Sequence, residues 1–208
     1  LHTTGVNPSD VKIRAGGFPD LLAAGPVIPH SDGAGVITAV GEGVSRSRVD
    51  EQVFVYQAQY GRQLGTAAQY VALDSTRAPV LPDAASFEVG ACIGIPIMTA
   101  HRCVFADGPV AGQLILVTGG AGRVGHYAIQ WAHRAGARVI ATASNEEDAT
   151  ACREAGAEAV VNHRVPDWGK AVLDLTEGQK IDRVIDVEFG ANLPELLNCV
   201  RILSLIHI

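Results

Sequence analysis

The sequence predicts an α/β protein in which a small β-rich domain is followed by a doubly wound parallel sheet. Two observations predict this fold class. Short β-rich runs punctuated by Gly, Pro and Asp occupy residues 1–85. From about Gly112 onward, unbroken apolar runs alternate with stretches of helical periodicity, the order that right-handed crossovers require. With 208 residues, of which 48% are hydrophobic and 18% charged, the chain can bury a core, and disorder is excluded.

The first domain is expected at residues 1–85. Leu1–Thr4 is typical of a strand that enters a turn at Gly5–Pro8, and three later runs are typical of strands, namely residues 33–41, 52–56 and 68–73. Residues 86–108 are expected to connect the two domains through a helix that Pro96 interrupts.

The second domain is expected at residues 109–202. Leu114–Val117 is wholly apolar, as in a strand covered on both faces. Apolar residues then recur at helical spacing from Val124 to Ala135, and Gly136 ends that helix. The later elements are a strand at 138–143, a helix with a capping box of Ser144 and Glu147 that runs to Gly156, a strand at 159–162, a helix at 168–175 closed by Gly178, and a strand at 181–187.

Charge and apolar patterning exclude several classes of function. Sixteen Lys and Arg against 22 Asp and Glu give a net charge of −6 without a basic run, so nucleic acid is not expected as a partner. The longest apolar stretch, Val89–Ala100, contains Pro96 and is shorter than the ~18 residues that span a bilayer, so a water-soluble chain is expected. No secretory signal opens the chain, and a cytoplasmic location with reduced thiols is predicted for its four separated cysteines, Cys92, Cys103, Cys152 and Cys199.

A glycine-rich turn follows the first strand of the second domain. Gly120, Gly122 and Gly125 form Gly-x-Gly-x-x-Gly between an apolar strand and an amphipathic helix, which is the context of a dinucleotide-binding turn. The first glycine allows the tight turn, the second the approach of a pyrophosphate, and the third close packing of helix on strand. The alternative is a structural turn that binds nothing.

The residues after the second strand favour NADPH over NADH. No carboxylate ends that strand, and Ser144 leaves room for a 2′-phosphate. Glu146 and Glu147 fall in the first turn of a helix, where acids complement the helix dipole. His163 and Arg164 could supply positive charge to the phosphate, or form a solvated loop pair.

Several ordered motifs together resemble the zinc-free quinone oxidoreductases, the zeta-crystallin branch of the medium-chain dehydrogenase/reductase superfamily. The resemblance implies a GroES-like domain, an incomplete Rossmann domain, NADPH as cofactor and a homodimeric full-length form. The motifs are Gly5-Val6-Asn7-Pro8-Ser9-Asp10, Ser31-Asp32-Gly33-Ala34-Gly35-Val36, Ile93-Gly94-Ile95-Pro96 with Thr99-Ala100, the glycine turn, and Asn162-His163-Arg164.

The resemblance also implies that no metal is bound. Zinc-dependent relatives need a Cys near Asn7, a His-Glu pair at Ser31-Asp32 and another Cys near Gly94, and none of these is present. His30 is the one ligand type nearby, and a lone His is more often a loop residue than a metal ligand.

Site residues are carried over by position. Asn7 and Lys12 are the candidates for holding a substrate carbonyl, although many members have a tyrosine at the position of Lys12, and Phe18 stands where another tyrosine often occurs. Arg123 departs from the small residue common at its position and could reach the pyrophosphate or point to solvent. The cofactor-binding candidates are Thr99, Gly120, Ala121, Gly122, Arg123, Val124, Gly125, Ser144, His163, Arg164 and Asn192, the last expected in the loop after the fourth strand.

The implied activity is hydride transfer from NADPH to a quinone or another α,β-unsaturated carbonyl compound. One alternative is an enoyl-thioester reductase, which needs a basic entry patch for which only Arg46 and Arg48 are candidates. Another is a crystallin-like protein that binds NADPH without turnover.

Both ends of the chain are expected to be interrupted. Leu1 is not an initiator Met, and the sequence after Arg201 lacks the glycine turn that should precede another strand. Residues 203–208 also correspond to the translation of a transposon-end adapter used in sequencing libraries, so we interpret them as a non-native tail.

Overall fold

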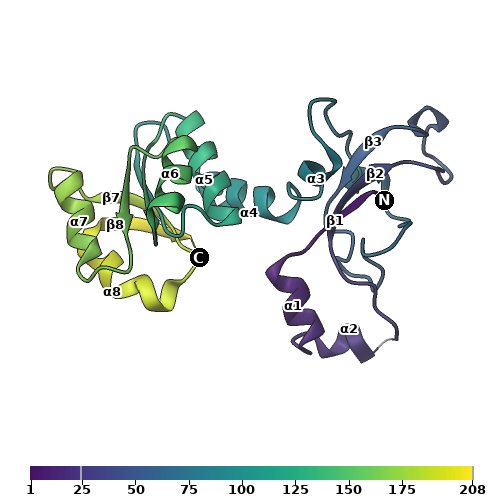
Figure 1. Cartoon of the computed structure of the whole chain (residues 1–208), viewed down its shortest axis with the longest axis horizontal. Helices are drawn as coiled ribbons and strands as arrows, with labels where there is room; N and C mark the ends of the chain where they lie inside the picture. The colour runs from purple at the N-terminus through teal and green to yellow at the C-terminus, as the bar shows by residue number, and fades with distance from the viewer. Residues whose placement is uncertain (24, 208) are drawn as a thin grey trace. The chain divides into compact units, whose positions relative to one another are not determined.

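The computed structural model describes residues 1–23 and 25–207 and divides the chain into two units (Figure 1). The first unit comprises Leu1–Ile95 and the second comprises Pro96–Ile208. The division falls within the segment 86–108 that was expected to connect two domains. None of the helices in the described part of the chain is both long and apolar enough to cross a membrane.

The first unit is built on a small antiparallel sheet. Its strands β1 (Thr3–Gly5), β2 (Asp32–Val36) and β3 (Gln52–Val55) lie in the order β1-β2-β3. The sheet packs on a modest apolar cluster of Val53, Val55, Ala58 and Ala78. The helices are α1 (Pro8–Arg14), α2 (Pro19–Ala23) and α3 (Phe87–Gly90), with 3₁₀ turns η1 (Arg46–Arg48) and η2 (Ser75–Arg77).

Two sequence-based expectations for this unit are wrong. Residues 68–73 form no strand, because the preceding residues Gly65, Thr66 and Ala67 donate their backbone N–H groups to the loop at 28–30 instead of to a ladder. The strand expected at 33–41 ends at Val36. The helix α1 was not expected at all.

The second unit is an α/β layer structure. Its five parallel strands lie in the order β6-β5-β4-β7-β8. Their bounds are β4 (Leu114–Val117), β5 (Arg138–Ala143), β6 (Ala159–Asn162), β7 (Ile181–Ile185) and β8 (Val200–His207). The expected fold class, a doubly wound parallel sheet, is confirmed.

Helices cover both faces of this sheet (Figure 1). One apolar cluster joins the strands to residues of α4 (Ile95–Phe105), α5 (Arg123–Arg134) and α6 (Glu146–Glu154). A second cluster, on the other face, includes Trp168 and Val172 of α7 (Trp168–Leu175) and Leu196 and Cys199 of α8 (Phe189–Cys199).

Several details of this unit differ from expectation. Pro96 does not interrupt a helix: it lies in the first turn of α4, where its missing N–H is not needed. The cap of α6 is Asn145 and not Ser144, since the Asn145 side chain accepts the Asp148 N–H at 2.9 Å. The strand β7 ends two residues early, at Ile185, and Asn192 lies within α8 and not in a loop.

Residues 200–207 form the edge strand β8, although residues 203–208 were excluded from the expected fold. Pairing with β7 shifts register between Ile181 and Arg183, and Leu203 has a positive φ of 63° at this irregularity. Ile208 lies outside the described residues. The non-native origin of 203–208 stays a prediction.

Candidate cofactor and substrate sites

The glycine turn joins β4 to α5 at the carboxyl edge of the parallel sheet. Thr142, near the end of β5, fixes the first residues of the glycine turn. The Thr142 carbonyl accepts the Gly120 N–H at 2.8 Å, and the Thr142 hydroxyl accepts the Gly119 N–H at 3.0 Å. The Gly122 N–H then turns back to the Gly119 carbonyl at 2.9 Å. Thr142 was not among the residues expected at the site.

The fingerprint glycines Gly120 and Gly125 have a steric reason to lack a side chain. A Cβ on Gly120 would lie 2.7 Å from Cys152 Sγ, and one on Gly125 would overlap the Gly119 carbonyl oxygen. Gly122 is the N-cap of α5 and brings no side chain to cap that helix. The uncapped helix start therefore fits an anionic group such as a pyrophosphate.

The turn lies beside the point where strand order reverses. The sheet runs β5-β4-β7, and ligands of open α/β sheets bind outside the carboxyl ends of strands at such a switch point. A buried network occupies this edge: Thr118 Oγ1 and Asn192 Nδ2 donate to Asp186 Oδ1 at 2.6 and 2.7 Å. Thr118 and Asp186 were missed by the sequence analysis, and their one signal is a polar residue directly after an apolar strand.

A second cluster lies where β5 and β6 end. The Asn162 side chain donates to the Ser144 carbonyl at 3.5 Å, and His163 N–H donates to the Ala143 carbonyl at 3.1 Å. The fold thus brings Ser144, His163 and Arg164 to one edge of the sheet.

A carboxylate that the sequence analysis did not single out also lies at this edge. Asp148 Oδ2 accepts the Ser144 hydroxyl at 3.2 Å and Asn145 Nδ2 at 2.8 Å. The Ser144 hydroxyl expected to face a 2′-phosphate therefore donates to a carboxylate instead. Of the other candidates, Arg123 is exposed at the first residue of α5, and Thr99 is exposed on α4.

In the first unit, Asn7 lies between two buried carboxylates. Its Nδ2 donates to Asp32 Oδ2 at 2.8 Å, and its backbone N–H donates to Asp10 Oδ2 at 2.7 Å. Asp32 Oδ2 also accepts the Ile95 N–H at 2.9 Å, while its Oδ1 is buried without a partner. Asn7 is only 4% exposed, so at most one amide hydrogen remains for a ligand. Lys12 is exposed on α1.

Burial raises the pKa of Asp32 above its ordinary value of 3.8, and the hydrogen bonds from Asn7 and Ile95 oppose that rise. Gly94 packs directly on this carboxyl group, because a Cβ there would overlap Asp32 Oδ1. These residues do not fit a zinc ion. Asp32 already accepts two N–H groups, Asn7 presents an amide N–H, and Gly94 has no ligand atom.

Within the described residues, no group of three His, Cys, Asp or Glu side chains is arranged to hold a metal ion. Binding without metal stays a prediction.

Comparison with known proteins now adds to this geometry. The family model described as "Alcohol dehydrogenase GroES-like domain" matches residues 1–83, and the one described as "Zinc-binding dehydrogenase" matches residues 124–204. The chain belongs to the medium-chain dehydrogenase/reductase superfamily. The resemblance inferred from its motifs is thereby confirmed.

A quinone oxidoreductase of Rattus norvegicus is 34% identical over 203 residues, covering 96% of this chain and 60% of the relative. A quinone oxidoreductase of Escherichia coli, solved with NADPH, superposes with a TM-score of 0.82 at 27% identity and covers 98% of this chain and 61% of that one. The enoyl reductase CurK superposes with a TM-score of 0.84 at 25% identity, covering 98% and 62%. The chain therefore spans about 60% of the length of these relatives.

Proposed function

We propose that this chain carries the cofactor and substrate sites of an NADPH-dependent oxidoreductase that transfers hydride to a quinone or another α,β-unsaturated carbonyl compound, without metal. The observation that carries the proposal is the uncapped glycine turn at the β4/β7 switch point, a ready binding place for a dinucleotide. The quinone oxidoreductase relatives support the substrate class.

In this proposal the backbone around Gly120–Gly125, with Ala121, Arg123 and Val124, holds the pyrophosphate. Ser144, His163 and Arg164 hold the 2′-phosphate, and Thr99 and Asn192 border the nicotinamide. When bound, the cofactor supplies the hydride. The remaining amide hydrogen of Asn7, helped by Lys12, orients the substrate carbonyl.

The test follows NADPH oxidation with naphthoquinone and cyclohexenone, before and after dialysis against a chelator. We expect turnover that chelation leaves unchanged. NADPH should bind about tenfold or more tightly than NADH, since one charge-assisted contact is worth about 1.5–3 kcal/mol. Arg164→Ala should remove most of that preference, whereas Arg134→Ala, on the far end of α5, should not. Equal dissociation constants for both cofactors in the unaltered chain would refute the NADPH assignment.

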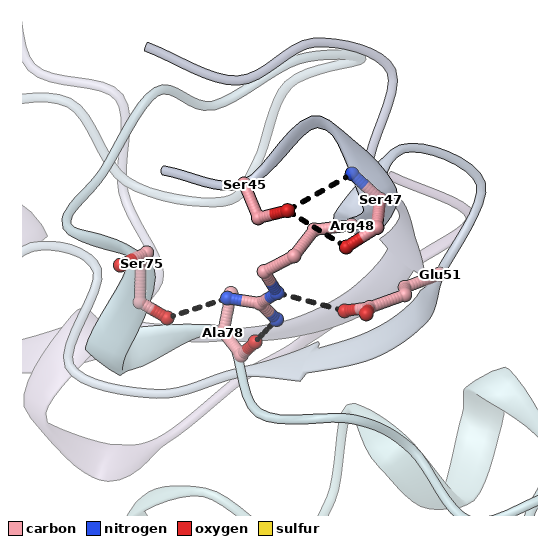
Figure 2. Close-up of polar contacts among 6 residues, drawn as sticks. All are labelled: Ser45, Ser47, Arg48, Glu51, Ser75 and Ala78. Atoms are coloured by element: carbon pink, nitrogen blue, oxygen red, sulfur yellow. Dashed lines mark hydrogen bonds and ion pairs between the residues drawn. The ribbon is translucent and has the colours of Figure 1, made fainter. Parts of the chain in front are cut away.

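An enoyl-thioester reductase is the second candidate, and the CurK likeness favours it. Such a substrate needs free positive charge for its phosphate groups. Arg48 does not offer it, because its guanidinium donates to Glu51 Oε2 at 2.7 Å and to the carbonyls of Ser75 and Ala78 at 3.2 and 2.6 Å (Figure 2). Arg46 alone remains exposed. Faster turnover of an enoyl-thioester than of cyclohexenone would favour this candidate.

A non-catalytic, crystallin-like role is the third candidate. It requires that NADPH binds and that neither naphthoquinone nor cyclohexenone is reduced. We also propose a cytoplasmic location, which the four free thiols support, and a homodimeric full-length form. Light scattering on the full-length protein measures its oligomeric state.

A further inference from the structure

Three consecutive N–H groups clamp the loop before β2. Gly65, Thr66 and Ala67 donate to the carbonyls of Ile28, His30 and Pro29 at 2.8, 2.9 and 3.0 Å. Gly65 permits this approach, because a Cβ on it would overlap those same carbonyl oxygens. The backbone of the loop is therefore fixed from outside.

The clamp holds His30 in a left-handed backbone conformation with φ +76°. A non-glycine residue pays about 1–2 kcal/mol for this conformation, so it persists only where surrounding contacts impose it. Strained residues of this kind concentrate at functional sites. The His30 imidazole is therefore a candidate functional group.

The hydrogen bonds of Thr4 determine which nitrogen of a protonated ring is left for a ligand. Both nitrogens of an imidazolium carry hydrogen, so Nδ1–H donates to Thr4 Oγ1 at 3.0 Å. Thr4 Oγ1 has one hydrogen of its own, for which Thr66 Oγ1 at 2.8 Å and the Asp32 carbonyl at 3.2 Å are acceptors. Nε2–H is then the ring hydrogen that a ligand can receive.

His30 lines a pocket of about 450 Å³ in the first unit. Most of its wall is apolar, and the charged residues Asp10 and Arg14 of α1 share the lining. Thr4, which bonds to the ring, and Thr66 both donate to the backbone carbonyl of Asp32, at 3.2 and 2.6 Å. An apolar pocket with one imidazole and a few charged groups suits a small carbonyl compound. Asn7, the residue proposed to orient that carbonyl, lies three residues before Asp10 and bonds to its carboxylate.

We propose that His30 is the proton donor of the reduction, an inference that rests on the proposed function. After the substrate gains hydride, its oxygen holds the displaced electron pair. The imidazolium Nε2–H bond breaks, an O–H bond forms, and the neutral imidazole keeps Nδ1–H on Thr4. Solvent then returns a proton to Nε2, so electrons and protons balance over the cycle.

The experiment compares three variants of the chain, each assayed for turnover from pH 5 to 9 and for melting temperature. His30→Asn removes the proton donor but tolerates the left-handed backbone. His30→Gly also removes the donor and relieves the strain. His2→Asn is the matched control, since His2 belongs to the same unit and stacks on Phe87 with ring centroids 4.4 Å apart.

With cyclohexenone, both His30 variants should lose about 10²-fold in kcat. Unaltered turnover should fall as the pH rises and the imidazolium is lost, and this limb should vanish in His30→Asn. His30→Gly should melt at a higher temperature than the unaltered chain, so its lost turnover cannot come from misfolding. His2→Asn should keep the full profile.

Two outcomes overturn the inference: His30→Asn with unaltered kcat and pH profile, or a turnover loss equal in His2→Asn. If the unaltered chain reduces nothing, the proposed function fails, and NMR of the His30 ring with cyclohexenone added separates the two claims. A shift confined to Nε2 then supports His30 as the ligand-facing group, and no shift overturns it.

Discussion

The glycine turn of the second unit and the Asn7–Asp32 region of the first unit are built on opposite principles. In the glycine turn, the proposed binding of a dinucleotide depends on side chains that are absent, since a single carbon on Gly120 or Gly125 would collide with packed atoms. Around Asn7, the proposed orientation of a substrate carbonyl depends on polar side chains that are present and buried, with Asp32 only 1% exposed. The first kind of site should fail when an atom is added, and the second when a polar atom is removed.

Adding an isopropyl group to the glycine turn should give the largest effect. In Gly125→Val the new Cβ overlaps the backbone oxygen of Gly119, which cannot move away as a flexible side chain would. We expect a loss of about 4 kcal/mol in the free energy of unfolding and no detectable NADPH binding. Denaturant titration and fluorescence titration measure the two.

Gly190→Val is the matched control for that change. Gly190 lies in α8 of the same unit, and nothing stands within 4 Å of a Cβ placed on it. Its stability should change by less than about 0.5 kcal/mol. Equal losses of stability and of NADPH binding in both variants would contradict the steric role of Gly125.

Removing a polar group from the first unit should give the next largest effect. Asp32→Ala leaves Asn7 Nδ2 and the Ile95 N–H buried without their acceptor. We expect a loss of about 2–3 kcal/mol, because each buried unpaired donor costs about 1–3 kcal/mol.

Asp32→Asn sharpens this result through pH. Burial raises the pKa of Asp32 in the folded state, so the folded chain keeps its proton to a higher pH than the unfolded chain. The free energy of unfolding should therefore fall as pH rises from about 4 through the raised pKa, and then level off. Asn cannot ionise, so this part of the decrease in the free energy of unfolding should be absent in the variant. Denaturant titrations at several pH values decide it, and an unchanged slope would contradict the assignment.

The smallest effect is expected at Arg48, whose side chain is only partly buried. Figure 2 shows the polar contacts that its guanidinium makes. Arg48→Ala removes the bonds that tie η1 to the η2 region, and we expect a loss of about 1–2 kcal/mol. The neighbouring exposed residue provides the control, since Arg46→Ala should change stability by less than about 0.5 kcal/mol. A larger loss at Arg46 than at Arg48 would contradict this role of the guanidinium.

The same contrast explains how well the sequence predicts each unit. In the second unit, β4, β5, β6 and α7 have the expected bounds, because periodic apolar patterns specify them locally. The glycine turn was predicted from its spacing together with the apolar strand before it and the amphipathic helix after it. Thr142 was missed because its role arises only once β5 lies beside β4.

The first unit is harder to predict because its backbone is held by individual bonds between distant residues. The N–H groups of Gly65–Ala67 serve a loop more than 30 residues earlier, so residues that follow them do not extend a ladder. Asp32 contacts Asn7 and Ile95, which are 25 and 63 residues away. No local pattern announces such contacts, and His30 was consequently interpreted as an ordinary loop residue.

The reactivity of Cys152 reports on the opening of the glycine turn. Its thiol lies beneath Gly120, is buried, and has its pKa raised to about 11 by that burial. Alkylating reagents attack the thiolate, so this sulfur reacts only when the turn lifts away from it. The rate at which Cys152 is alkylated would therefore measure how often the turn opens, and a bound dinucleotide should lower that rate.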